Sequence, residues 1–227
     1  MNHEAYKQMF ECENRHWWFL GMRAITAAIL NNHLPWQHAS ISILDVGCGT
    51  GGTLAQFKND ARVTGVDLFP EALKFCQLRG LSSISQATVE ALPFRENTFD
   101  LVTCFDVLNQ LRTTRGAIAE AFSVLKLGGW LLIREPAYDF LRANRHDLAL
   151  DTHHRFNATE LIEKLESAGF RVSRVTYANT ILFPIAAVMR LVERLLRLRN
   201  TLGTHPDLNF SVCDKLLFKT LRLEAKL

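Results

Sequence analysis

The sequence predicts an α/β fold: a doubly wound, mainly parallel sheet with a helical lid before it and a helical appendage after it. Short apolar runs alternate with helix-length segments of roughly ten residues, the pattern of strands joined by crossover helices. A glycine-rich turn, Gly47–Gly52, directly follows the first apolar run, and an acidic residue, Asp67, closes the second. Such sheets bind their ligand at the carboxyl ends of the strands, so we expect the site at that edge.

Pattern and composition divide the chain into three parts. Residues 1–33 are expected to form a helical lid, residues 34–180 the ligand-binding core, and residues 181–227 a helical cap or interface segment. The core is expected to hold an insertion at residues 135–156, after its fifth strand. A chain of 227 residues is long enough to bury a sizeable core as one domain with an appendage.

The elements of the core have local signals of their own. Pro70 opens a helix at its first turn, where the missing N–H costs nothing. Asn157 and Glu160 have the spacing of a capping box at the start of another helix. Six strands are expected, at residues 41–46, 62–67, 83–87, 101–105, 130–134 and 170–177. Helical segments are expected at residues 53–58, 70–78, 106–111, 114–125 and 157–168, with a C-cap at 126–129.

The bulk composition limits the function classes. The net charge of +3 comes from 26 basic and 23 acidic residues, and the surplus of base lies in residues 190–227. The core therefore has no basic footprint, and nucleic acid is not favoured as a substrate. The absence of a signal pattern and of a C-x-x-C pair favours a reducing, cytoplasmic location. The five scattered cysteines are Cys12, Cys48, Cys76, Cys104 and Cys213.

The loop motif admits two interpretations. Gly47, Gly49 and Gly52, with Asp67 twenty residues after Gly47, satisfy the fingerprint of a dinucleotide site. A nicotinamide-linked oxidoreductase therefore stays open as an alternative. The longer form Asp-x-Gly-x-Gly-x-Gly, which begins at Asp45, resembles the first motif of class I methyltransferases that depend on S-adenosyl-L-methionine (SAM). In that family the first acid lies under the loop and engages the methionine portion of the cofactor.

Later landmarks resemble the same family and extend the resemblance over residues 13–180. They are Ala91-Leu-Pro-Phe94, Phe99-Asp100 and Leu125-Lys-Leu-Gly-Gly129, the last close to the family's L-K-P-G-G. The resemblance implies a Rossmann-like class I methyltransferase fold with SAM as cofactor and S-adenosyl-L-homocysteine as product. The cofactor contacts that it implies are Asp45, Gly47, Cys48, Gly49, Gly51, Asp67, Leu68, Thr88, Val89, Glu90, Phe105 and Asp106.

The run Glu13–Arg23 is similar to the E-x-x-H-W-W-F-x-G-R opening of one bacterial subgroup of that family. Met22 stands where the pattern has arginine, and Arg23 is expected to substitute for it. We expect this run to be part of a lid in which Trp18 shields the cofactor and Arg23 meets its carboxylate. The alternative is an aromatic helix pinned to the core.

Candidates for the chemistry follow the fifth strand. Methyl transfer needs a base when the nucleophile is a hydroxyl that must lose its proton. His153 or His154 is the expected general base, oriented by Asp151 or Glu135, and Tyr138 is a further catalytic candidate. The alternative is that the histidine pair only hydrogen-bonds its loop to the sheet. The spacing of histidines and acids has no pattern diagnostic of a metal site.

The C-terminal part has two amphipathic segments, Pro184–Arg199 and Phe210–Leu223. They could cap the substrate, pair two subunits in a homodimer, or place arginines against a membrane surface. The sequence as a whole predicts transfer of a methyl group from SAM to an oxygen or nitrogen of a small molecule. A non-catalytic scaffold that keeps the cofactor fold stays open beside the oxidoreductase alternative.

Overall fold

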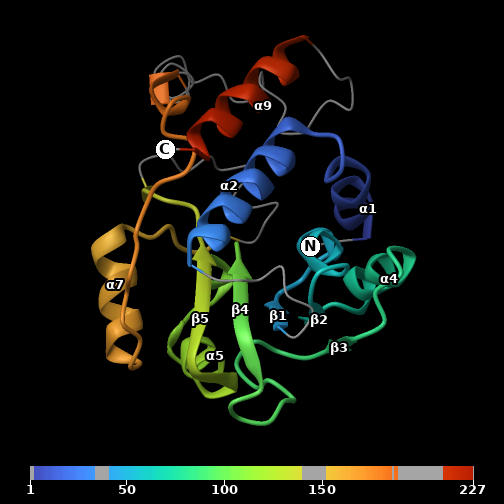
Figure 1. Cartoon of the computed structure of the whole chain (residues 1–227), viewed down its shortest axis with the longest axis vertical. Coiled ribbons are helices and arrows are strands. Elements are labelled where there is room, and N and C mark those ends of the chain that lie inside the picture. Colours follow the sequence, from blue (N-terminus) through green and yellow to red (C-terminus); the bar gives the residue numbers. More distant parts are fainter. Residues whose placement is uncertain (1–2, 34–40, 140–151, 186, 189–211, 227) are drawn as a thin grey trace.

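The computed structural model describes residues 3–33, 41–139, 152–185, 187–188 and 212–226 (Figure 1). Its centre is a five-stranded, all-parallel sheet in the order β3-β2-β1-β4-β5. The strands are β1 (Ser42–Val46), β2 (Arg62–Asp67), β3 (Ile84–Gln86), β4 (Phe99–Phe105) and β5 (Leu125–Arg134). The predicted doubly wound α/β class is confirmed.

Helices cover both faces of the sheet because both sets of alternating strand side chains are apolar. On one face, Leu44 and Val102 belong to a core cluster with residues of α5 (Arg115–Val124) and α7 (Ala158–Ser167). On the other, Ile43 and Leu101 pack with residues of α2 (Trp17–His33) and α3 (Gly52–Phe57). Helix α4 (Pro70–Leu78) adds Cys76 to a cluster with Leu54 on that second face.

The carboxyl ends of the strands point toward a second layer of helices. In Figure 1 the arrows of β4 and β5 rise toward α2 and α9 (Val212–Glu224), while α1 (His3–Cys12) lies beside α4. Helix α9 lies along α2, and Leu221 fills the notch at Gly21, where an added Cβ would lie only 2.3 Å from its Cδ1 atom. Helix α1 therefore lies at the edge at which we expect the site, and α9 packs on the helix that covers a face of the sheet.

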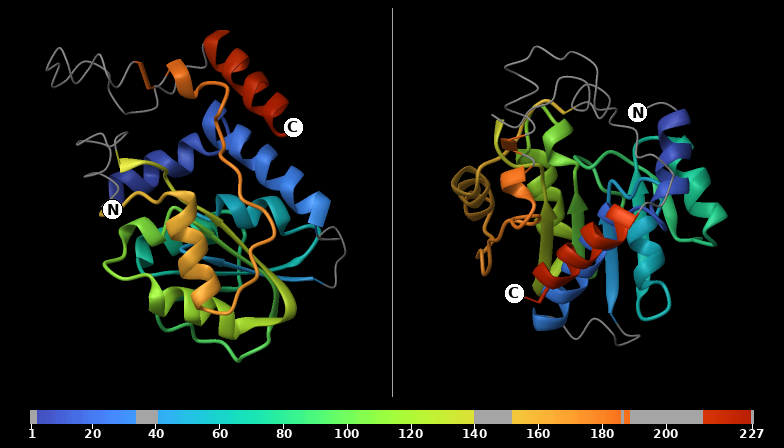
Figure 2. Two further views of the ribbon diagram at one scale, coloured as in Figure 1. Left: turned by 90° about the vertical axis from the view of Figure 1, so that its left-hand side faces the viewer. Right: turned by 90° about the horizontal axis from the view of Figure 1, so that it is seen from above.

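The sixth predicted strand is wrong. Residues 171–177 run as an irregular segment from α7 to the top of the molecule (Figure 2). Phe170 packs edge-on against Phe122 at 5.0 Å, but Val175 and Tyr177 are exposed, and no ladder in the described part of the chain includes this segment. Alternating β-branched and aromatic residues suit a strand, but they do not supply a neighbouring strand to pair with.

Two smaller expectations also change. The predicted helical stretch at residues 106–111 is only a 3-10 turn, η1 (Leu108–Gln110). The predicted C-cap at residues 126–129 lies within β5, whose pairing with β4 shifts register there, with Gly128 at φ +77°. Most of the predicted insertion (140–151) and of the segment 184–199 falls outside the described residues. No helix in the described ranges is long and apolar enough to cross a membrane.

Candidate active site

The glycine loop turns sharply at the carboxyl end of β1. Gly47, Gly49 and Gly51 all have positive φ, at +73°, +53° and +78°. An added Cβ at Gly47 would lie 2.4 Å from the Cγ2 atom of Val107, so both the conformation and the packing require glycine there. The next helix, α3, begins at Gly52. The loop therefore presents its backbone at the carboxyl edge, where a nucleoside-bearing ligand can approach closely.

Asp67 ends β2 and ties its carboxylate to this loop. Its Oδ2 accepts a hydrogen bond from the N–H of Gly49 at 2.8 Å, and its Oδ1 accepts one from the N–H of Phe69 at 2.9 Å. Burial raises the pKa of Asp67, while these N–H groups oppose the increase. Each carboxylate oxygen keeps further lone-pair capacity, which suits the two hydroxyls of a ribose. The ribose contact of Asp67 stays a prediction.

Asp45 lies beneath the loop and is almost fully buried, at 3% exposure. The Thr103 hydroxyl donates a hydrogen bond to its Oδ1 at 2.6 Å. Burial raises the pKa of Asp45 to about 7, with smaller increases from the charges of Asp67 and Glu13, whereas the Thr103 hydroxyl and the Arg134 charge lower it. Asp45 therefore titrates near neutral pH in the folded chain.

This pKa leads to a pH-dependent prediction. The folded-state pKa is raised, so Asp45 is mainly protonated below about pH 7, and a cationic ligand binds better to its ionised form. We expect SAM affinity to fall by up to tenfold per pH unit as the pH drops below about 7. Calorimetric titrations at about pH 6 and pH 8 measure this effect, and Asp45→Asn should flatten the profile. An unchanged profile in Asp45→Asn would assign the titration to another group.

The segment after β3 forms the next part of the site. The N–H of Glu90 lies 3.4 Å from the Thr88 hydroxyl, which it uses as an acceptor, and Val89 is buried in the core. Leu68 is 53% exposed beside Asp67. Thr88 thus stabilises its own turn. The turn presents its backbone at the position where the resemblance places the adenine. The adenine contacts of this segment stay a prediction.

Phe105 ends β4 and Asp106 follows it, and both contact an arginine that the sequence analysis missed. Asp106 has φ +58°, an uncommon conformation for a residue other than glycine. Arg134, at the end of β5, forms an ion pair with Asp106 at 2.7 Å and lies 4.5 Å over the Phe105 ring. The sequence offered one signal for this role of Arg134, which is a basic residue at the end of a strand next to the expected site. Arg134 fixes the turn that carries both predicted cofactor contacts.

The part of the lid that lies over the glycine loop differs from the prediction. Helix α1, rather than Trp18, lies over the loop, with the Met9 Sδ atom 3.7 Å from the position of a Cβ on Gly49. Trp18 is partly buried and packs against the cluster of Met22 and Leu221 between α2 and α9. The structure therefore places Trp18 between two helices and not at the loop. This part of the motif fits the alternative of an aromatic helix packed against the core.

Arg23 does reach the loop. Its Nη2 atom lies 2.9 Å from the position that a Cβ would take on Gly52, and its Nη1 atom donates to the Asn14 side chain at 3.1 Å. The buried carboxylate of Glu13 lies beside it, and burial lowers the pKa of Arg23 while Glu13 raises it. The prediction that Arg23 meets the cofactor's carboxylate fits this position. Cys48, by contrast, turns its thiol into the core, 3.9 Å from Cys76 Sγ, so only its backbone faces the loop.

Glu135 is an anchor of the turn after β4. Its carboxylate accepts hydrogen bonds from the N–H groups of Val107, Leu108 and Asn109 at 3.1, 2.8 and 3.1 Å. Burial and the Asp106 charge raise its pKa to about 8, against the opposing effect of the three N–H groups. These contacts use the carboxylate to position the turn, and the orientation of a histidine by Glu135 stays a prediction.

His153 and His154 are held next to that same turn. The N–H groups of both residues donate to the carbonyl of Asn109, at 2.8 and 3.2 Å. The Nε2 atom of His154 lies 2.9 Å from the Glu160 carboxylate on the first turn of α7. The described part of the chain thus pairs His154 with Glu160, which sequence reasoning used only for capping. Asp151, the other predicted partner, lies outside the described residues.

Tyr138 lies after β5 in an unusual conformation. Its φ is +59°, and its ring stacks on Tyr177 with centroids 5.3 Å apart and planes 17° apart. Phe183 approaches the same ring at 6.4 Å. Non-glycine residues at positive φ persist only where their surroundings hold them, and they cluster at functional sites. The aromatic stack provides that support at the carboxyl end of β5.

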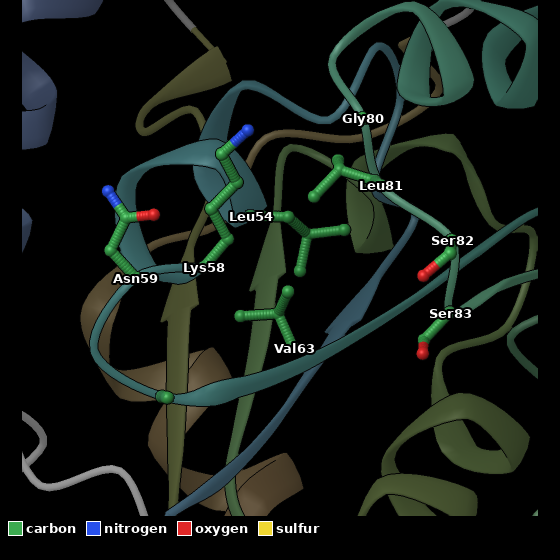
Figure 3. Close-up of a pocket in the computed structure, with 9 residues that line it drawn as sticks. Leu54, Lys58, Asn59, Val63, Gly80, Leu81, Ser82 and Ser83 are labelled. Atoms are coloured by element: carbon green, nitrogen blue, oxygen red, sulfur yellow. The ribbon is translucent and has the colours of Figure 1, made fainter.

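A cavity of about 340 Å³ lies elsewhere on the molecule, between the end of α3 and the start of β3 (Figure 3). It adjoins the amino end of β2, opposite the edge that carries Asp67. Its position excludes it as the site defined by the glycine loop. Its lining residues are Leu54, Lys58, Asn59, Ala61, Val63, Gly80, Leu81, Ser82 and Ser83.

The parallel sheet, the glycine loop and the carboxylate of the second strand lie within the part of the chain that resembles known proteins. Residues 44–133 match the family model of a methyltransferase domain. This stretch holds β2, β3 and β4 and most of β1 and β5, and the glycine loop and Asp67 lie within it.

Two curated proteins of the same name are similar to part of this chain. The ubiquinone biosynthesis O-methyltransferase of Nitrosomonas europaea is 34% identical over 131 residues, 51% of this chain and 55% of that protein. The enzyme of the same name from Albidiferax ferrireducens is 36% identical over 109 residues, 44% and 42% of the two chains. This chain thus spans about half the length of these curated relatives or less.

Solved structures support the fold. The YcgJ protein of Bacillus subtilis has a TM-score of 0.60 at 19% identity, covering 84% of this chain and 91% of its own. A SAM-dependent methyltransferase from Aquifex aeolicus also scores 0.60, at 18% identity, covering 78% of this chain and 92% of its own. At these identities the likeness concerns the fold alone.

Proposed function

We propose that the chain is an enzyme that transfers a methyl group from SAM to a small molecule. The main support is Asp67, whose carboxylate is held against the N–H of Gly49 at the carboxyl edge of the sheet. The residues present fit SAM, because a ribose-binding carboxylate, a glycine loop and the guanidinium of Arg23 lie on one edge. No comparison supports the oxidoreductase or scaffold alternatives.

Bound SAM would supply an electrophilic methyl group on a sulfonium centre. The chain's residues then have to hold the acceptor and exclude water, since in-line displacement depends on positioning. Asp45 and Asp67 balance the positive charge of the ligand, and Arg23 balances its carboxylate. Incubation with SAM and a panel of small hydroxyl and amine compounds, with S-adenosyl-L-homocysteine measured by mass spectrometry, tests the activity. Failure of every acceptor together with absent SAM binding would contradict the proposal.

We further propose that the methylated atom is a hydroxyl oxygen. The relatives' names end in O-methyltransferase, and a hydroxyl acceptor needs a base. His154 is the better base candidate because Glu160 fixes its ring, as the carboxylate does in other His–carboxylate pairs. This choice leaves Nδ1 as the nitrogen that takes the proton.

We expect His154→Ala to lower kcat by about 10²–10⁴-fold, the usual worth of a general base, and to leave SAM affinity unchanged. His153→Ala is the matched control, because its backbone bond to Asn109 survives the substitution. Steady-state rates with an active hydroxyl acceptor measure the difference. Equal losses in both variants would show that the loop matters only for its structure.

A separate proposal concerns the exposed apolar residues before and at the start of the segment 184–199. Ile181, Phe183, Ile185 and Val188 are exposed at the start of the arginine-rich segment 184–199. We propose that this region touches an anionic membrane surface, which vesicle flotation would detect. A homodimer through the same segment is the competing use, and light scattering separates the two. Buried free thiols at Cys48 and Cys104 fit the proposed cytoplasmic location.

A further inference from the structure

Helix α1 forms a wall of the proposed cofactor site although it precedes the glycine loop by more than thirty residues. Met9 lies against Gly49, as described above. Tyr6 is only 4% exposed, and its ring centroid lies 6.2 Å from that of Phe69. Burial, and after it the charge of Asp67, raises the pKa of its hydroxyl. The inner side of α1 therefore faces both the loop and the carboxylate that would hold the ribose.

One buried ion pair fastens the end of α1. Glu13 follows the helix, and its Oε2 atom lies 2.6 Å from the Nη2 atom of Arg79, with side chains only 8% and 7% exposed. The same guanidinium donates from Nε to the carbonyl of Thr50 at 2.7 Å, within the glycine loop. It also lies 4.4 Å over the Phe10 ring of α1. Arg79 thus joins the lid to the loop through a single rigid group.

The loop is shaped around this pair. An added Cβ at Gly52 would lie 2.5 Å from Glu13 Oε2 and 2.9 Å from Arg23 Nη2. The carboxylate of Glu13 therefore sits directly against the start of α3, between two arginines. Arg79 is the arginine that Glu13 holds at hydrogen-bonding distance, whereas Arg23 feels the same carboxylate through its charge.

We propose that the Glu13–Arg79 pair is a latch that holds α1 over the glycine loop, and that cofactor affinity depends on it. The proposal rests on the proposed function and makes Arg79 a positioning residue for SAM. A buried pair is strongly destabilised when one partner is removed, because the other charge is left unpaired. Removal of both partners leaves no such charge. The latch therefore predicts non-additive effects, which independent contacts would not give.

The test uses the full chain with Glu13→Gln, Arg79→Gln and the double variant. Hydrogen exchange of the amides of residues 4–16 reports α1 without any ligand, and calorimetry reports SAM affinity. We expect each single variant to speed exchange in α1 and to weaken SAM binding by about tenfold or more. The double variant should lose no more than the worse single variant. Glu4→Gln, at an exposed position on the same helix, is the matched control and should change neither quantity.

The outcomes separate the latch from the proposed function. Unchanged exchange in α1, or losses in the double variant that multiply, would overturn the latch. Faster exchange with unchanged SAM affinity would overturn the dependence of the cofactor on it. A wild-type chain that fails to bind SAM refutes the proposed function, and the latch is then judged from exchange alone. Arg79→Lys keeps the positive charge but loses the planar guanidinium with its several N–H donors. It replaces any variant that does not fold.

Discussion

Replacing Asp67 with alanine is expected to weaken SAM binding by at least about 100-fold, since each hydrogen bond to a charged group is worth roughly 1.5–3 kcal/mol and 1.4 kcal/mol is a factor of ten. The change removes the carboxylate proposed for the ribose and also frees the N–H of Gly49 that it holds at 2.8 Å. Isothermal calorimetry of SAM with both chains measures the loss directly.

Asp100→Asn is the matched control for this change. Asp100 also accepts a backbone hydrogen bond, from Ser42 at 2.9 Å, and pairs with Lys126 at 2.8 Å, but it lies near the opposite end of the sheet. We expect Asp100→Asn to lower the unfolding free energy and to leave the SAM dissociation constant unchanged. Equal effects of Asp67→Ala and Asp100→Asn on SAM binding would contradict a ribose-binding role for Asp67.

Replacing Gly47 with alanine is expected to lower the unfolding free energy by about 2–5 kcal/mol. About 1–2 kcal/mol comes from the left-handed backbone conformation and about 1–3 kcal/mol from overpacking. The new Cβ would lie 2.4 Å from the Cγ2 atom of Val107, which belongs to the turn anchored by Glu135. Urea unfolding followed by circular dichroism measures the change.

Two further variants separate the causes. Gly128→Ala has a similar φ of +77° but no atom within 4 Å of the added Cβ, so it should show only the conformational cost of about 1–2 kcal/mol. Val107→Ala in the Gly47→Ala background should recover part of the overpacking cost. If Gly47→Ala costs no more than Gly128→Ala, the contact with Val107 does not constrain the loop.

Much of the core could be predicted because its signals are local. The limits of β2 and α4 follow directly from the apolar run that Asp67 ends and from Pro70. Asn157 caps α7 as expected, accepting a hydrogen bond from the N–H of Glu160 at 2.9 Å. The glycine loop and Asp67 could be placed together because parallel strands bring their carboxyl ends to one edge.

The failures concern partners that are distant in sequence. A strand at residues 170–177 needs a neighbour, which a single segment cannot specify. The sequence left open whether Trp18 faces a ligand or another helix. Trp18 packs against the cluster that contains Leu221 of α9, two hundred residues later in the sequence. The sequence also did not predict that the Glu135 carboxylate accepts hydrogen bonds from three backbone N–H groups of one turn.

The missed members of the site are charged residues whose sequence context is ordinary. Arg79 ends a helix beside Gly80, which indicates only a C-terminus, yet its side chain reaches Glu13 and the loop. Arg134 ends a strand, and Glu160 lies at a capping position, so each has a sufficient local explanation. Only the packed chain reveals their second contacts.

The most direct test of this account is a calorimetric titration of SAM, and separately of a reduced nicotinamide dinucleotide, into the wild-type chain. The account predicts saturable binding of SAM, inhibited by S-adenosyl-L-homocysteine, and no heat from the nicotinamide. Binding of the nicotinamide without binding of SAM would contradict it and would reassign the glycine loop and Asp67 to the dinucleotide interpretation.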